Sequence, residues 1–167
     1  VAIGRDALYG TSTTSANING CVAIGYNSLK AITTGVACVA VGHSSQIVGA
    51  TTDYNTSIGH ESLRFNVSGD LNTAVGYRSQ YGDGGVSHSV NTSVGSNSLN
   101  VVTSGEANVA IGVHSGAALN DEDNNAYVGA YSARYMFGDG NVAVGKDALM
   151  GATFTQGSCS YNDDPTI

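Results

Sequence analysis

Charged side chains are scarce in this sequence. They make up 11% of the 167 residues, whereas about 25% is usual for a soluble globular protein. Proline occurs once, at Pro165, which excludes collagen-like and proline-rich linker sequences. Tryptophan does not occur. An apolar share of 41% is too high for a disordered tail. Because 23 glycines punctuate a chain rich in Ser, Thr and Asn, we expect one ordered β domain.

Positive charge is also sparse. Six Lys and Arg residues lie singly along a chain whose net charge is −7, so there is no basic stripe for nucleic acid or an anionic membrane. No apolar run approaches the ~18 residues of a membrane span. We therefore expect no nucleic-acid partner and no membrane insertion. The sequence begins within a repeat and without Met, and we expect it to be a segment of a longer chain.

A short motif recurs nine times, with Ile or Val before Gly and, in eight of the nine copies, Ala or Ser before the Ile or Val. Successive motif glycines are 17 residues apart in five of the eight intervals, and 16, 19 or 21 apart in the others. This length favours one coil of a β-solenoid, since a propeller blade needs about 40 residues and a leucine-rich repeat at least 20. The motif glycines are Gly4, Gly25, Gly42, Gly59, Gly76, Gly95, Gly112, Gly129 and Gly145.

Three further columns of residues keep the same register. Asn stands four residues before most motif glycines, Ser or Ala always stands three residues after them, and Leu often stands four residues after them. Cys21 and Cys38 replace Asn in the second and third copies. The Asn column comprises Asn55, Asn72, Asn91, Asn108, Asn125 and Asn141.

Each column predicts a structural role. The β-branched residue before Gly alternates with a small residue, as along a strand. We expect the β-branched side chains to share the core with Leu, and the small side chains to admit a neighbouring chain. Stacked Asn side chains should form a ladder between parallel strands ~4.8 Å apart, and Gly should occupy the corner where the chain leaves the strand.

The fold class that follows is an all-β parallel β-solenoid with nine coils of about 17 residues. It should occupy residues 1–151, and residues 152–167 should form a degenerate last coil or a transition to further sequence. Cys159 lies where a tenth Asn would stand.

The motif resembles the repeats of two groups of fibrous proteins. Residues 108–115 read Asn-Val-Ala-Ile-Gly-Val-His-Ser, a pattern similar to the head repeats of trimeric autotransporter adhesins of the YadA-like type. Residues 72–77 read Asn-Thr-Ala-Val-Gly-Tyr and resemble the repeats of phage tail-fibre proteins. The resemblance spans residues 1–151 and implies a left-handed parallel β-roll, three chains packed around a common axis, and attachment to a cell surface. Longer coils, the two Cys substitutions and unequal inserts depart from the adhesin pattern.

The thinness of each coil independently favours association. A coil offers roughly three core-sized apolar side chains, which bury little area at ~25 cal/mol/Å² against ~1.5 kcal/mol of ordering entropy per residue. We expect neighbouring copies of the chain to supply the missing burial, so the first expected partner is the protein itself, as a homotrimer.

Few residues suggest chemistry. His43 and His60 follow motif glycines in successive copies, and we expect their rings to stack on the outside, although two ligands are too few for a typical zinc site. We expect Cys21 and Cys38 to be buried thiols, because parallel neighbours in register direct their Cβ atoms poorly for a disulfide. The acidic run 121–123 is more typical of a solvated loop than of paired glycosidase carboxylates. We predict no catalytic residue, metal or cofactor.

The inserts indicate where recognition could lie. Residues 9–19 and 80–90 lengthen the first and fifth repeats at the same place, between the Leu or Gln position that follows the motif Gly and the next Asn column. Tyr is the dominant aromatic residue, and Tyr beside Ser, Gly and Asp is typical of adaptable recognition surfaces. Tyr that merely fills coil corners is an equally weighted alternative. The possible receptor-facing residues are Tyr9, Tyr54, Tyr81 and His88.

The sequence favours a non-catalytic segment of an elongated trimeric fibre, either a viral tail fibre or a bacterial surface adhesin. Its expected location is extracellular, and its expected second partner is a cell-surface glycan or protein receptor. A carbohydrate-active solenoid is one alternative. An ice-binding solenoid is another, because Thr56, Thr73 and Thr92 should stack, although Val39 and Val109 interrupt that column.

Overall fold

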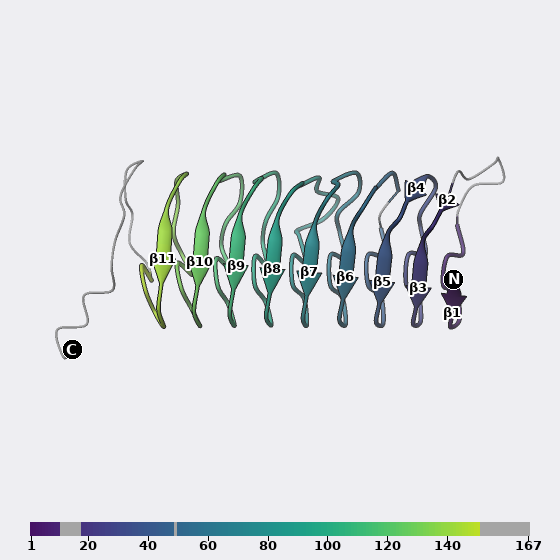
Figure 1. Cartoon of the computed structure of the whole chain (residues 1–167), viewed down its shortest axis with the longest axis horizontal. Helices are drawn as coiled ribbons and strands as arrows, with labels where there is room; N and C mark the ends of the chain where they lie inside the picture. Colours follow the sequence, from purple (N-terminus) through teal and green to yellow (C-terminus); the bar gives the residue numbers. More distant parts are fainter. Residues whose placement is uncertain (11–17, 49, 151–167) are drawn as a thin grey trace.

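The computed structural model describes residues 1–10, 18–48 and 50–150 as a stack of similar coils (Figure 1). One short strand from each coil joins a nine-stranded parallel sheet, in the order β1-β3-β5-β6-β7-β8-β9-β10-β11, and β2 pairs with β4 separately. The strands are β1 (Ala2–Ile3), β2 (Ile18–Asn19), β3 (Val22–Ile24), β4 (Gly35–Val36), β5 (Val39–Val41), β6 (Thr56–Ile58), β7 (Thr73–Val75), β8 (Thr92–Val94), β9 (Val109–Ile111), β10 (Ala126–Val128) and β11 (Val142–Val144).

This architecture confirms the predicted all-β parallel solenoid. The described residues contain no helix, and therefore none that is long and apolar enough to cross a membrane. The predicted terminal segment 152–167, including Cys159, lies outside the described residues.

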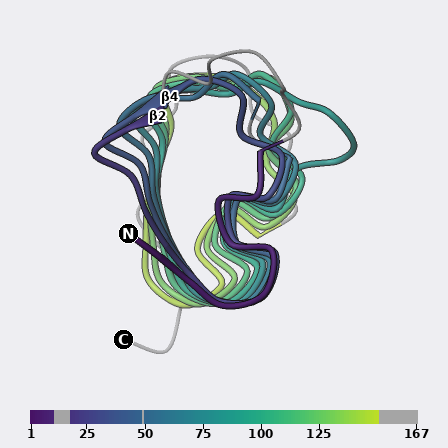
Figure 2. The same ribbon diagram turned by 90° about the vertical axis from the view of Figure 1, so that its right-hand side faces the viewer.

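Equivalent residues of successive coils face one another. Thr73 of β7 pairs with Thr56 of β6 on one side and with Thr92 of β8 on the other. Backbone hydrogen bonds continue the pairing beyond the strands, for example from the Asn97 amide to the Tyr77 carbonyl at 2.8 Å. Seen along the stack, the coils superimpose, and the insert of the fifth coil projects to one side (Figure 2). The columns seen in the sequence are therefore columns in space.

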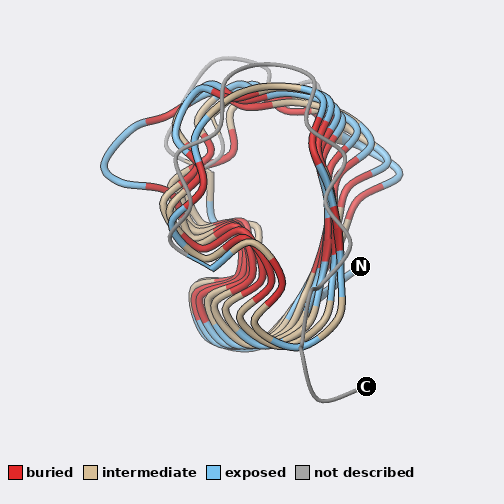
Figure 3. Ribbon diagram, turned by 90° about the vertical axis from the view of Figure 1, so that its left-hand side faces the viewer, coloured by how far each residue is buried: buried red, intermediate tan, exposed pale blue. Residues whose placement is uncertain are grey.

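The two faces of the sheet are the reverse of the prediction. The residue two before each motif Gly, which is Ala or Ser in every copy except Tyr127, points inward in the coils from β3 to β11, and the β-branched residue before Gly points outward. Ala110 is fully buried, whereas Ile111 beside it is 41% exposed. The cause is the bend after each motif Gly, which folds back inside the coil (Figure 3). The Ser62 hydroxyl of one bend donates to the Ala74 carbonyl at 2.9 Å, so the bend leaves little room over the middle of the strand in the coils that carry Ala or Ser there.

The interior is apolar at both ends and polar between them. One apolar cluster includes Leu29, Ile32 and Cys38, and the other includes Leu99, Leu119 and Met136. Between the clusters, Gln46 and Gln80 replace Leu at the fourth position after the motif Gly, and both are fully buried. Gln80 Nε2 donates to Ser93 Oγ at 3.0 Å. Side-chain hydrogen bonds therefore stabilise part of the interior in place of apolar packing.

The Asn column forms the predicted ladder, but its main partner is the backbone. Asn91 Oδ1 accepts the Asn108 backbone N–H at 2.8 Å, and Asn91 Nδ2 donates to the Gly105 carbonyl at 2.7 Å. The side-chain amides of Asn55, Asn72, Asn91 and Asn108 each satisfy two backbone groups of the next coil in this way. Backbone N–H bonds to Oδ1 recur from Asn72 to Asn55, Asn91 to Asn72, Asn125 to Asn108 and Asn141 to Asn125.

The two thiols take the place of Asn in this ladder. Cys21 and Cys38 are free and buried, as predicted. Cys38 Sγ donates to the Thr52 carbonyl at 3.1 Å, which is the coil position that Asn55 Nδ2 contacts one coil later, at the Gly69 carbonyl. Burial raises the pKa of the Cys38 thiol, so it stays a neutral donor.

Gly76 illustrates why the corner requires glycine. Its φ of 131° lies in a region that other residues rarely adopt, and a Cβ there would lie 2.5 Å from the Gly95 carbonyl oxygen of the next coil. We expect Gly76→Ala to lower the free energy of unfolding by roughly 2 to 6 kcal/mol, because backbone strain and overpacking add. Gly84→Ala is the matched control, since Gly84 has a φ of 71° and open space around its Cβ position. If denaturant unfolding shows equal losses of unfolding free energy in Gly76→Ala and Gly84→Ala, the clash with the Gly95 carbonyl does not contribute to the loss.

Cys38→Asn should restore the ladder. The amide would reach both the Thr52 carbonyl and the Asn55 backbone N–H, two groups that the thiol contacts now. We expect thermal unfolding of Cys38→Asn at or above the wild-type temperature. Cys38→Ala should unfold at a lower temperature, because it leaves a buried carbonyl without its donor, at a cost of about 1 to 3 kcal/mol. If both variants lose the same stability, the thiol does not act as an Asn substitute.

Candidate recognition surface

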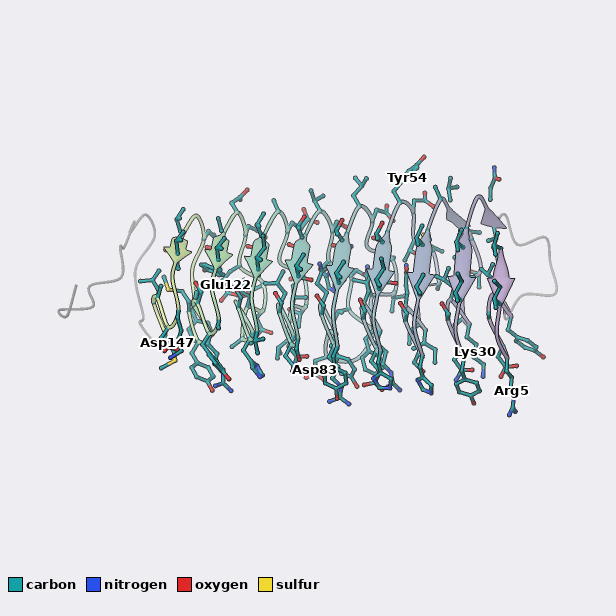
Figure 4. All side chains as sticks on the ribbon, turned by 60° about the horizontal axis from the view of Figure 1, so that its bottom comes forward. Arg5, Lys30, Tyr54, Asp83, Glu122 and Asp147 are labelled. Atoms are coloured by element: carbon teal, nitrogen blue, oxygen red, sulfur yellow. The ribbon has the colours of Figure 1, made fainter. Side chains whose placement is uncertain are left out.

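The four possible receptor-facing residues do not share one surface. Tyr9 is 70% exposed and Tyr54 is 56% exposed. Tyr54 extends from one edge of the solenoid, whereas Arg5, four residues before Tyr9 in the sequence, lies on the opposite edge (Figure 4). Tyr81 is half-buried and packs edge-on against Phe65, with ring centres 5.0 Å apart. Tyr81 therefore belongs partly to the scaffold.

His88 is not receptor-facing, and the prediction for it is wrong. The residue is fully buried, and neither ring nitrogen has a hydrogen-bond partner within the described part of the chain. Its backbone carbonyl accepts Asn72 Nδ2 at 2.8 Å, so the Asn ladder holds this part of the insert inside the coil. Burial disfavours the charged ring and lowers the pKa of His88 to about 4.

We name the six residues after each motif Gly the bend edge. On this edge an aromatic stack crosses four successive coils. Ring centres are 5.1 Å apart between Tyr26 and His43, 4.9 Å between His43 and His60, and 5.5 Å between His60 and Tyr77. The predicted outward stacking of the two histidines is thus confirmed. Among the described residues, no three His, Cys, Asp or Glu side chains gather as metal ligands.

A cluster of charged and aromatic side chains adjoins this stack. Glu61 pairs with both Arg64 and Arg78, from its own coil and the next. The Arg78 guanidinium lies 5.2 Å from the Tyr77 ring centre and 4.9 Å from that of Tyr81. Burial, the neighbouring His43 and the two arginines lower the pKa of His60. A cluster of this kind combines flat aromatic rings with a positive charge, both of which serve recognition.

Charge is segregated between the two edges of the coil. The bend edge carries all six basic residues and only three acidic ones, which are Asp6, Glu61 and Asp147. The other eight acidic residues in the described range lie elsewhere in the coils. The basic residues are Arg5, Lys30, Arg64, Arg78, Arg134 and Lys146.

Most acids away from the bend edge bond to the backbone. Asp stands six residues before several motif glycines, and its carboxylate accepts the N–H of the equivalent residue in the preceding coil. Sequence reasoning missed this Asp column, although its constant offset from Gly was visible. The bonds run from Val36 to Asp53, Asp53 to Asp70, Glu106 to Asp123 and Asp123 to Asp139, at 2.7 to 2.8 Å.

The acidic run 121–123 is divided among different roles. Asp121 is exposed, Glu122 is buried and accepts the Asn120 backbone N–H at 2.6 Å, and Asp123 belongs to the Asp column. Two of the three acids are thus engaged with backbone amides, as structural carboxylates are.

Comparison with protein-family models, curated proteins and solved structures gave no match for this chain. What the chain does must therefore be inferred from its surface.

Burial of His88 predicts acid sensitivity. Its pKa is about 4 in the fold against 6.5 when unfolded, so between these values the unfolded chain binds more protons. The stabilisation is complete above about pH 6.5 and decreases as pH falls toward 4, by roughly 3 kcal/mol in total. We expect His88→Leu to unfold with a weaker pH dependence than wild type in denaturant titrations across this range.

Tyr54→Leu, which removes an exposed ring from a residue that is not a histidine, is the control and should keep the wild-type pH dependence. The account of His88 is wrong if His88→Leu and wild type lose stability in parallel between pH 6.5 and 4.

Proposed function

We propose that the chain is a non-catalytic segment of an elongated homotrimeric fibre, which provides structural spacing and attachment to a cell surface. Its location is extracellular, on a virion tail fibre or a bacterial surface, and its coils form a left-handed β-roll of nine turns. One observation carries the proposal, namely the apolar outer face of the nine-stranded sheet.

This outer face consists of the first and third residues of each strand. Its exposed large apolar side chains are between 37% and 62% accessible, and they follow one another in register along the sheet. A contiguous apolar stripe of this kind marks an interaction site more often than a free surface. The exposed members are Ile3, Ile58, Val94, Val109, Ile111, Val128, Val142 and Val144.

The geometry of the stripe favours another copy of the chain as its partner. The stripe runs parallel to the solenoid axis, and its side chains repeat at the ~4.8 Å spacing of parallel strands. A second copy aligned along the axis offers the same spacing, so each coil meets an equivalent coil. Three copies around one axis form a closed arrangement that covers all three stripes, and the resemblance to trimeric fibre proteins favours this number.

The surface that remains exposed in such a trimer would mediate attachment. The bend edge carries the aromatic stack and every basic residue of the chain, whereas the apolar stripe lies on the sheet. Tyr and Arg are the residues that most often dominate recognition surfaces. A non-catalytic role is supported by the eight described acids away from the bend edge, five of which accept backbone amides, four of them in the Asp column.

Ile111→Lys should weaken the trimer. Ile111 is 41% exposed on the sheet face, and burying a charge between apolar side chains is unfavourable. Val113→Lys is the matched control, because Val113 is 42% exposed but lies beyond the motif Gly, outside the sheet. We expect sedimentation velocity to show trimers for wild type and Val113→Lys, and dissociation at higher concentration for Ile111→Lys.

A stably folded wild-type monomer at low concentration would contradict the proposal. Unchanged association of Ile111→Lys would contradict the assignment of the interface to the sheet face.

A further inference from the structure

Arg134 differs from the other basic residues in its partners. Every other Lys and Arg lies within 4.0 Å of a carboxylate, whereas Arg134 pairs with none in the part of the chain that the structure describes. Its guanidinium instead lies 5.4 Å from the Tyr131 ring centre and 4.9 Å from that of Tyr135. Arg134 is half-buried and Tyr135 is 49% exposed.

The coil of Arg64 provides an internal comparison. Arg64 and Arg134 both stand five residues after a motif Gly, and an aromatic ring follows each of them. In the Arg64 coil, Glu61 supplies a carboxylate that pairs with the guanidinium. In the Arg134 coil, Tyr131 stands at the position of Glu61. The same arrangement of guanidinium and ring is therefore present, but no carboxylate of the described residues pairs with this guanidinium.

The next coil does not replace that carboxylate. Its equivalent acid is Asp147, and this side chain pairs with Lys146 at 2.9 Å. On the other side, the His114 ring stacks on Tyr131 with centres 5.4 Å apart. Burial and the neighbouring Arg134 lower the pKa of His114, so this ring is neutral at pH 7. Within the described residues, the patch thus combines flat aromatic surface with one positive charge that no carboxylate pairs with.

We propose that Arg134 binds a carboxylate or sulfate group of an acidic glycan, and that the exposed Tyr135 ring packs against the sugar. This inference rests on the proposed attachment function and specifies its ligand. A guanidinium can present two parallel N–H donors to the oxygens of an anion, and Glu61 shows that arginines of this edge hold a carboxylate, with one oxygen on Arg64 and the other on Arg78. Because the bend edge carries all six basic residues and three of the eleven described acids, it is the edge that an anionic ligand is expected to approach.

The test measures binding of the full chain to three oligosaccharides by calorimetry. The probes are sulfated cello-oligosaccharide for sulfate, oligogalacturonate for carboxylate, and unmodified cello-oligosaccharide as the neutral control. We expect wild type to bind at least one acidic probe, more weakly at higher salt, and not the neutral one. The acidic probe that binds identifies the anion.

Arg134→Gln should weaken this binding at least tenfold, as loss of a charged hydrogen bond does. Tyr135→Ala should weaken it severalfold. Arg134→Lys, which keeps the charge but not the planar fork, should give an intermediate affinity and serves if Arg134→Gln does not fold. Lys30→Gln is the matched control, because Lys30 holds the same coil position but pairs with Asp6, and its affinity should stay within twofold of wild type.

Equal binding of wild type and Arg134→Gln would overturn the inference, and so would equal losses in Arg134→Gln and Lys30→Gln. Thermal unfolding and sedimentation confirm that each variant keeps its fold and association. Cell attachment separates this inference from the proposed function. If Arg134→Gln attaches to cells as wild type does, the Arg134 site is wrong while attachment stands. If wild type binds the acidic probe but no cell, the site stands and the attachment function fails.

Discussion

From Gly4 to Gly129, each motif glycine lies directly against the carbonyl of the motif glycine in the next coil, and a Cβ atom would not fit between them. At Gly76, a Cβ would lie 2.5 Å from the oxygen of Gly95. This contact brings successive coils to the spacing of neighbouring parallel strands without lateral displacement. Since every coil is then a near copy of the previous one, any residue type that bonds well to itself or to the backbone can form a column. The Asn, Ser and Asp columns all depend on that alignment.

The repeat was predictable because its columns recur at fixed offsets from glycine. The corner glycine, the Asn ladder, the stacked His43 and His60 and the buried thiols all follow from register alone. The direction of the strand faces did not, because a period of two defines two faces without saying which is inside. The bend decides this, by filling the interior over the middle of each strand. His88 was misplaced because an insert has no register with the repeat.

The candidate site was still less accessible from sequence. Its features depend on partners in neighbouring coils, such as Glu61 between Arg64 and Arg78. The sequence columns also do not show where a large residue in one column is accommodated by a small residue in another. Tyr127 is fully buried where other coils have Ala or Ser, and Gly116 makes room for it, since a Cβ on Gly116 would lie 3.0 Å from the Tyr127 ring. Volume is thus conserved across adjacent coils rather than at each position.

The hydrogen bonds that join the coils all run along the solenoid axis, and this direction has a mechanical consequence. A force that pulls the two ends apart acts along these bonds and opens the stack one coil at a time, instead of shearing many bonds together. Neighbouring coils should separate first around Gln46 and Gln80, between the two apolar clusters, because apolar packing contributes least to holding the coils together there. Each coil of 17 residues that opens releases on the order of 55 Å of chain. A segment built in this way lengthens in steps under load. Each step releases chain and lowers the tension that a sudden pull creates between the two ends.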